Sequence, residues 1–235
     1  MTGDAQLALD EKGRLMFDSS LFWGEGGDIR MNGGEWTLEN RAAFFCYGDM
    51  ALEAAGGQIS LGEKAVFVTP DSDGGSFELE GASITLQDGE CRFWVVKESV
   101  FKDCDLNIEA GFFSNQTTRT TFLSSRINVE NRGYFQSNGT HAKLELLSGS
   151  VMENRGVAEM SGWTDQAMFT LHGTVKNEGE MFILIPAKLS DPIQNQGILY
   201  YNAEEQNRYR REKGKDILDF SMIEGNEPVE QVLDP

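Results

Sequence analysis

The stretch Val129-Glu-Asn-Arg-Gly-Tyr-Phe135 has three close copies farther along this 235-residue chain. They read Met152-Glu-Asn-Arg-Gly-Val157, Val175-Lys-Asn-Glu-Gly-Glu-Met-Phe182 and Ile193-Gln-Asn-Gln-Gly-Ile-Leu-Tyr200. Each copy has an apolar residue, then Asn two positions later, then Gly two positions after the Asn. Self-similarity at regular spacing indicates a repeat protein.

Weaker copies extend the repeat upstream, so that its apolar anchors stand at positions 38, 61, 86, 108, 129, 152, 175 and 193. A period in the low twenties is too short for helix pairs or propeller blades, and it fits one turn of a solenoid of short strands. Segments between the anchors alternate apolar and polar residues, as strands with one buried side do. The sequence therefore predicts an all-β parallel β-helix (β-solenoid) of about eight coils, with a short C-terminal helix and terminal caps.

Three kinds of residue at fixed places in the repeat carry structural expectations. The asparagines should stack at the strand spacing and hydrogen-bond along the axis, and the glycines should supply a positive φ at the corners. The aromatic residues just after the corner should form an internal stack. These positions are Asn131, Asn154, Asn177 and Asn195; Gly133, Gly156, Gly179 and Gly197; and Phe44, Phe67, Phe93, Phe112, Tyr134, Phe182 and Tyr200.

The repeat divides the chain into three parts. Residues 1–37 are expected to form an N-terminal cap or an irregular first coil, residues 38–200 the β-solenoid, and residues 201–235 a helix, a cap and an acidic tail. The segment 203–213 lacks Gly and Pro and predicts the helix. Such ends are expected because open strand edges promote aggregation.

Charge is the strongest compositional feature, with 38 acidic against 20 basic side chains and a net charge of −18. Such a surface repels nucleic-acid phosphates and anionic membranes, so neither partner is expected. It would attract a basic protein or, more weakly, Ca²⁺. Simple solubility explains the same charge.

Cysteine usage bears on the compartment. Cys46, Cys91 and Cys104 are too few and odd in number for a disulfide framework, and no export signal is recognisable. A cytoplasmic location is therefore expected, or a secreted one if the chain is a fragment of a longer protein. The oligomeric state stays open.

Catalytic motifs and metal-ligand spacings are not found, so no catalytic or metal-ligating residue is assigned. The densest carboxylates, Asp71 with Asp73 and Asp103 with Asp105, are candidate contacts for a basic partner, although Asp-x-Asp is also an ordinary loop sequence. Arg208, Arg210 and Arg211 are a candidate contact for an acidic partner, or the solvated face of the helix.

The Asn-x-Gly corners at 129–134, 152–157, 175–180 and 193–198 resemble the haemagglutinin-type repeats of right-handed parallel β-helix adhesins. The resemblance implies the solenoid fold and a role in adhesion. Our first hypothesis is instead a non-enzymatic protein-binding module. In this hypothesis the chain is an acidic immunity or inhibitor protein that occludes a basic toxin or enzyme. A carbohydrate-active or glycan-binding β-helix, using carboxylates and aromatics such as Trp94 and Trp163, is the alternative. A structural or adhesin solenoid fragment is the third.

Overall fold

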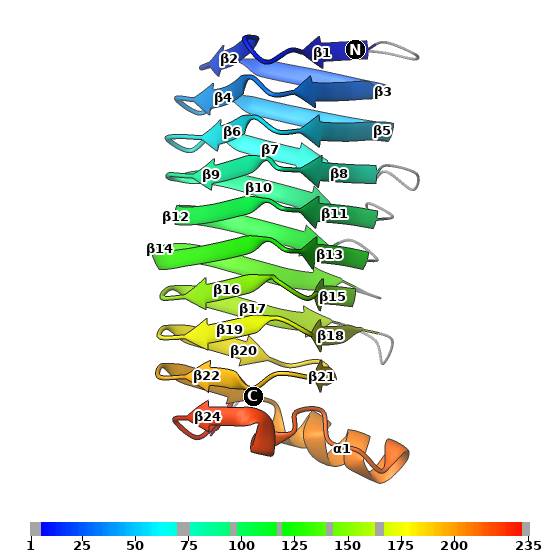
Figure 1. Cartoon of the computed structure of the whole chain (residues 1–235), viewed down its shortest axis with the longest axis vertical. Coiled ribbons are helices and arrows are strands. Elements are labelled where there is room, and N and C mark those ends of the chain that lie inside the picture. The colour runs from blue at the N-terminus through cyan, green and yellow to red at the C-terminus, as the bar shows by residue number, and fades with distance from the viewer. Residues whose placement is uncertain are drawn as a thin grey trace.

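The computed structural model describes residues 6–69, 76–94, 98–116, 119–139, 143–162 and 167–231. It is nearly all β, with 65% of residues in strands and 7% in helix, and its strands wind as a parallel solenoid. Figure 1 shows the strands stacked along the long axis with the helix at the C-terminal end. The predicted fold class is confirmed, with about 7 turns where about eight coils were predicted.

Three columns of parallel strands form the sides of the solenoid, and we call them faces A, B and C. Each of the eight predicted anchors falls in a strand of face A. This face consists of β2 (Arg14–Asp18), β4 (Glu35–Glu39), β6 (Gln58–Leu61), β9 (Ser83–Leu86), the first parts of β12 (Asp105–Gln116) and β14 (Arg126–Gly139), β16 (Val151–Asn154), β19 (Thr174–Asn177), β22 (Ile193–Asn195) and β24 (Ile223–Gly225).

Faces B and C follow in chain order after face A. Face B consists of the first parts of β3 (Leu21–Asn32) and β5 (Ala43–Ala55), β7 (Val66–Thr69), β10 (Gly89–Trp94), the second parts of β12 and β14, β17 (Val157–Gly162), β20 (Glu180–Ile183), β23 (Ile198–Tyr201) and β25 (Val229–Glu230). Face C consists of β1 (Gln6–Leu9), the second parts of β3 and β5, β8 (Ser76–Glu80), β11 (Glu98–Lys102), β13 (Arg119–Leu123), β15 (Lys143–Leu146), β18 (Met168–Leu171) and β21 (Ala187–Leu189).

The asparagine ladder is confirmed at three of its four predicted positions. The Nδ2 of Asn154 donates to Oδ1 of Asn177 at 2.7 Å, and the Nδ2 of Asn177 donates to Oδ1 of Asn195 at 2.8 Å. All three side chains are buried. Asn131 is exposed, because the corner of β14 is longer and places Val129, rather than Asn131, in register with Asn154. The prediction was wrong there.

The corner glycines are required for a different reason than the one expected. None of the four has a positive φ. Instead, a Cβ at Gly179 would lie 2.2 Å from the carbonyl oxygen of Gly156, and a Cβ at Gly197 would lie 2.1 Å from that of Gly179. Successive coils approach so closely at this corner that no larger residue fits.

The aromatic stack is internal only in part. Phe22, Phe44 and Phe67 stack in the core, with ring centroids 4.3 Å and 5.5 Å apart. In the later coils the neighbouring residues Phe113 and Phe135 occupy that inner position, so Phe112 and Tyr134 lie on the outer side of face B. Phe182 and Tyr200 also stack on the outer side, in register with Val229 of β25; the side chain of Phe93 lies outside the described residues.

The two ends of the solenoid differ. Residues 14–32, expected in a cap or irregular first coil, form β2 and β3 in register with the next coil. At the other end, α1 (Ala203–Lys213) begins at the N-cap Asn202 and ends at Gly214, whose φ is 65°. Buried Gln206 holds the helix in place by donating to the carbonyl of Leu218 at 3.1 Å and accepting from the amides of Ile217 and Leu218. A 3₁₀ turn (Phe220–Met222) then leads into β24.

Among the described residues, no helix is long and apolar enough to cross a membrane. Cys91 and Cys104 are free and buried, and burial raises the pKa of both thiols, which favours a core role over a reactive one. The side chain of Cys46 lies outside the described residues.

Candidate functional site

Two of the four carboxylates singled out from the sequence, Asp103 and Asp105, lie at one corner of the solenoid. Asp103 occupies the turn between faces C and A with a φ of 51°, and Asp105 begins β12 on face A. Both are exposed and border a shallow pocket of about 300 Å³, together with Arg126. Cys104 between them is buried. Asp71 and Asp73 lie outside the described residues.

The backbone of this corner recurs along the solenoid. Asp103, Ser124 and Gly149 occupy equivalent turn positions in successive coils, and all three have a positive φ. Buried Ser125 and Ser150 carry hydroxyls that accept from backbone amides of the coil before. Among the described residues, no group of three or more His, Cys, Asp or Glu side chains is placed to hold a metal ion.

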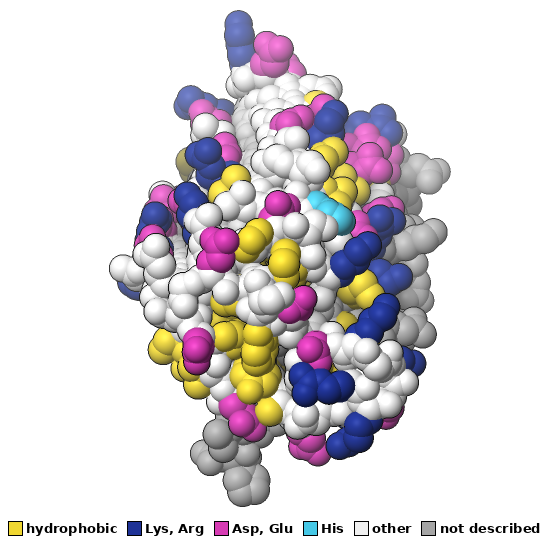
Figure 2. Space-filling view, turned by 60° about the horizontal axis from the view of Figure 1, so that its bottom comes forward, with side chains coloured by type: hydrophobic (Ala, Val, Ile, Leu, Met, Phe, Trp, Pro, Cys, Tyr) yellow, Lys and Arg dark blue, Asp and Glu magenta, His cyan; other side chains and the backbone are white. Residues whose placement is uncertain are grey.

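The basic residues singled out from the sequence lie on α1 at the C-terminal end. Two of them already pair within the chain, because Arg208 contacts Glu205 and the Nε of Arg210 lies 2.6 Å from Asp216. Figure 2, in which this end comes forward, shows Lys and Arg interspersed with Asp and Glu rather than gathered in one patch. Arg211 is exposed on the same helix. The structure does not bring these arginines near Asp103 or Asp105.

A groove on face C, which the sequence reasoning missed, brings three glutamates together with two basic side chains. Its volume is about 270 Å³, and its walls come from four successive strands of the face, β3, β5, β8 and β11. The charged residues that line it are Arg30, Glu53, Glu78, Glu80 and Lys102, with Ala55 and Val100 between them. We call it the face C groove.

The register of the strands sets the charges in this groove. Glu53 and Glu78 are direct partners on neighbouring strands, as are Ala55 and Glu80. Like charges placed directly opposite each other on a sheet are destabilising. Two cations offset part of the repulsion, since the Nε of Arg30 lies 3.1 Å from Glu53 and Lys102 pairs with Glu80. The charged lining of the groove therefore has one more negative than positive side chain, and Glu53 and Glu78 lie side by side as like charges.

The signal that could have revealed the groove is charge recurring at the repeat period. Glu53 and Glu78 are 25 residues apart, which is one turn of the solenoid in this part of the chain. Both strands belong to the alternating segments of the repeat, whereas the candidate carboxylates were chosen for the local density of Asp. In a solenoid, residues one period apart lie on neighbouring strands, so charges that are far apart in the sequence can be direct neighbours in space.

Face B carries a second polar network on its outer side. Tyr134 donates to Glu159, Gln136 donates to the same carboxylate at 3.2 Å, and Ser161 donates to its other oxygen at 2.5 Å. Burial, followed by the nearby carboxylate, raises the pKa of Tyr134, so the phenol stays protonated. These groups satisfy one another across adjacent coils. Within the described residues, this network therefore links adjacent coils, and we interpret it as structural rather than as an open binding site.

No protein-family model, no curated protein and no solved structure matches this chain. Its function is therefore inferred from the chemistry of its own surface.

Proposed function

We propose that this chain is a protein-binding module that takes Lys or Arg side chains of a basic partner into the face C groove. The observation that carries the proposal is the direct register of Glu53 with Glu78, beside Glu80. A bound cation between these carboxylates would remove the repulsion that the free protein bears. An immunity or inhibitor role, in which the acidic face covers a basic toxin or enzyme, is the form of this function that the net charge of −18 favours.

The groove suits cationic side chains better than a bare metal ion. Its carboxylates lie along an open surface, with Arg30 and Lys102 already among them. An extended basic segment can replace these two internal cations one by one, because exposed ion pairs are weak. Charge complementarity of this kind mainly speeds encounter and selects the partner, so binding should weaken as salt is raised.

A lysine peptide tests the groove directly. We expect Glu53→Gln/Glu78→Gln/Glu80→Gln to weaken binding of a fluorescent deca-lysine peptide about tenfold, since three exposed ion pairs of about 0.5 kcal/mol each are lost. The control Glu39→Gln/Glu63→Gln/Glu109→Gln removes the same charge from the corner between faces A and B and should change binding less than threefold. Fluorescence anisotropy at low and moderate salt measures both. Equal losses in the two variants would refute a localised site.

Stability gives an independent check. Glu78→Gln should raise the free energy of unfolding by up to about 0.5 kcal/mol at neutral pH, because it removes the like charge opposite Glu53. Thermal and urea unfolding measure the change, which 0.5 M salt should abolish by screening. A clear loss of stability would mean that the carboxylate is a structural element rather than a binding group.

Glycan binding is a second candidate, favoured by the stacked rings of Phe182 and Tyr200 on the outer side of face B. Aromatic rings beside polar groups are common in sugar sites, but here each ring already covers a face of the other. Trp163 and the side chain of Trp94 lie outside the described residues. Binding of neutral oligosaccharides, unaffected by the groove variant, would favour this candidate. The adhesin role implied by the Asn-x-Gly corners stays a further proposal, supported only by that motif.

A further inference from the structure

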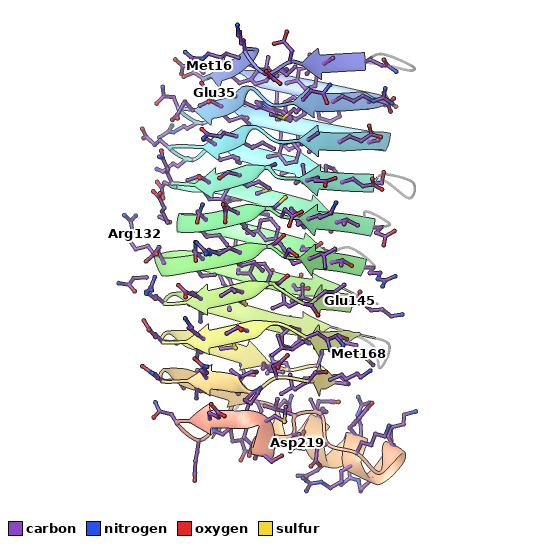
Figure 3. The ribbon with its side chains drawn as sticks, viewed as in Figure 1. Met16, Glu35, Arg132, Glu145, Met168 and Asp219 are labelled. Carbon is purple, nitrogen blue, oxygen red and sulfur yellow. The ribbon has the colours of Figure 1, made fainter. Side chains whose placement is uncertain are left out.

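The N-terminal end of the solenoid presents strand edges and apolar side chains together. Among the described residues, β2 pairs on one side only, with β4, and β1 likewise only with β3. Met16 is 70% exposed and Leu21 is 68% exposed, the two highest values among the large hydrophobic side chains of the described residues. Figure 3 labels Met16 at this end. Unpaired edges with apolar side chains readily accept another strand.

The core is also left partly open at this end. Leu7, Leu15, Phe17 and Phe22 all point inward and pack on the core, yet they are only partly buried, unlike their counterparts in the middle coils. At the C-terminal end Ala187, Leu189, Tyr201 and Ile223 are likewise partly buried, but there α1 and the segment around Leu218 pack on the last coil and Leu218 is fully buried. A partner at the N-terminal end would complete the burial of the four side chains there.

The sequence of β2 is complementary to itself when two copies run antiparallel. Its five residues read Arg14-Leu-Met-Phe-Asp18, with Met16 at the centre. Pairing about Met16 places Arg14 opposite Asp18 of the second copy, and Leu15 opposite Phe17 of the second copy. Charges then meet opposite charges on the outer side, and apolar residues meet apolar residues on the core side. This is the self-complementarity that a two-fold interface requires.

The rest of the end fits the same symmetry. A two-fold axis that crosses the solenoid through the middle of face A exchanges faces B and C. It therefore sets β1 of one copy against the first part of β3 of the other. The chain descends continuously from β1 through β2 to β3, so at the open end β1 stands higher than β2 and the first part of β3 lies lower. The raised β1 of one copy therefore meets the lower first part of β3 of the other, and the two ends interlock. Leu7 then lies over the core edge that contains Phe22 of the second copy.

We propose that two copies of this chain dock head to head at their N-terminal ends, with β2 pairing antiparallel to β2 about Met16. The in-chain contacts of the two charged residues are compatible with this pairing. Arg14 lies 3.0 Å from Glu35 and Asp18 accepts from Asn40 at 2.8 Å, both on the side of β4, so each side chain would be shared between this partner and its opposite charge on the second copy. The interface continues the sheet across two molecules.

Charge-swap variants test this pairing, with mass measured by multi-angle light scattering on the full-length chain without an N-terminal tag. The wild type should be a dimer. Arg14→Asp alone sets Asp opposite Asp18 of the second copy, and Asp18→Arg alone sets Arg opposite Arg14, so each should weaken the dimer at least tenfold. The double variant Arg14→Asp/Asp18→Arg restores opposite charges and should restore the dimer. Met16→Lys should dissociate it, whereas the control Met168→Lys, at an exposed methionine of face C, should not.

Three results would overturn the proposal. A wild-type monomer at about 100 µM would show that the end does not self-associate, since specific dimers of this kind form well below that concentration. A dimer that survives Met16→Lys would place the interface elsewhere. Failure of the double swap to regain what the single swaps lose would show that Arg14 and Asp18 do not face each other. Circular dichroism of each variant shows that the fold is kept, and binding of the lysine peptide is an independent readout.

Discussion

Replacing Asn177 with Leu should lower the free energy of unfolding by about 3–5 kcal/mol, one of the two largest effects expected of any single substitution in this chain. Asn177 is fully buried, and its amide contacts the amides of Asn154 and Asn195 and the carbonyl of Ile198. Leu has nearly the same shape as Asn but cannot form hydrogen bonds, so those three groups would lose Asn177 as a partner. Each buried polar group that loses its hydrogen bond costs about 1–3 kcal/mol. Urea unfolding followed by circular dichroism measures the change.

Asn131→Leu is the matched control for this prediction. Asn131 stands at the equivalent place in its own sequence repeat, but its side chain is exposed. The substitution should therefore change stability by less than about 0.5 kcal/mol. Similar losses for the two variants would contradict the register of β14 with β16, on which the shortened ladder depends.

Gly179→Ala should destabilise the chain by more than about 3 kcal/mol, because its Cβ would lie 2.2 Å from the carbonyl oxygen of Gly156. Backbone surrounds the position, so no flexible side chain can move aside. The neighbouring coils would have to separate locally, and hydrogen exchange of the amides around Asn177 should increase. Thermal unfolding and hydrogen exchange measure the two effects.

Gly214→Ala separates close approach from backbone strain. Gly214 has a φ of 65° but nothing within 4 Å of an added Cβ. Its replacement should cost only about 1 kcal/mol, the usual penalty for a left-handed residue with a side chain. If Gly214→Ala were the more damaging of the two, conformational freedom rather than space would explain the corner glycines.

The sequence predicts the parts of the fold that depend on the repeat period and on residues that end a helix or strand, such as Gly and Pro. The anchors from 38 to 193 all fall in face A, since residues one turn apart must share a face. The helix over 203–213 is also predicted, because the segment lacks Gly and Pro and ends at Gly214. These features depend only on the nearest turn and on neighbouring residues.

Register within the repeat is harder to predict, because corner lengths vary. The copies at 129 and 152 look equivalent, yet the longer corner of β14 moves Asn131 out to solvent and leaves Val129 beside Asn154. For the same reason the sequence does not reveal the paired glutamates of the face C groove, because their contact depends on the register of Glu53 with Glu78. Asp103 and Asp105 are two residues apart in sequence and lie on a corner with the buried Cys104 between them. Which charged side chains lie side by side therefore depends on register, which local density of charge in the sequence does not reveal.

Capture with paired baits tests the central claim that the face C groove binds a basic protein. The wild type, the groove variant Glu53→Gln/Glu78→Gln/Glu80→Gln and the corner variant Glu39→Gln/Glu63→Gln/Glu109→Gln would be immobilised and exposed to the same native lysate, and retained proteins quantified by mass spectrometry. We expect one basic protein near equal stoichiometry on the wild type and the corner variant, shed by moderate salt and lost from the groove variant. Equal retention on all three baits, or a partner insensitive to salt, would contradict the claim.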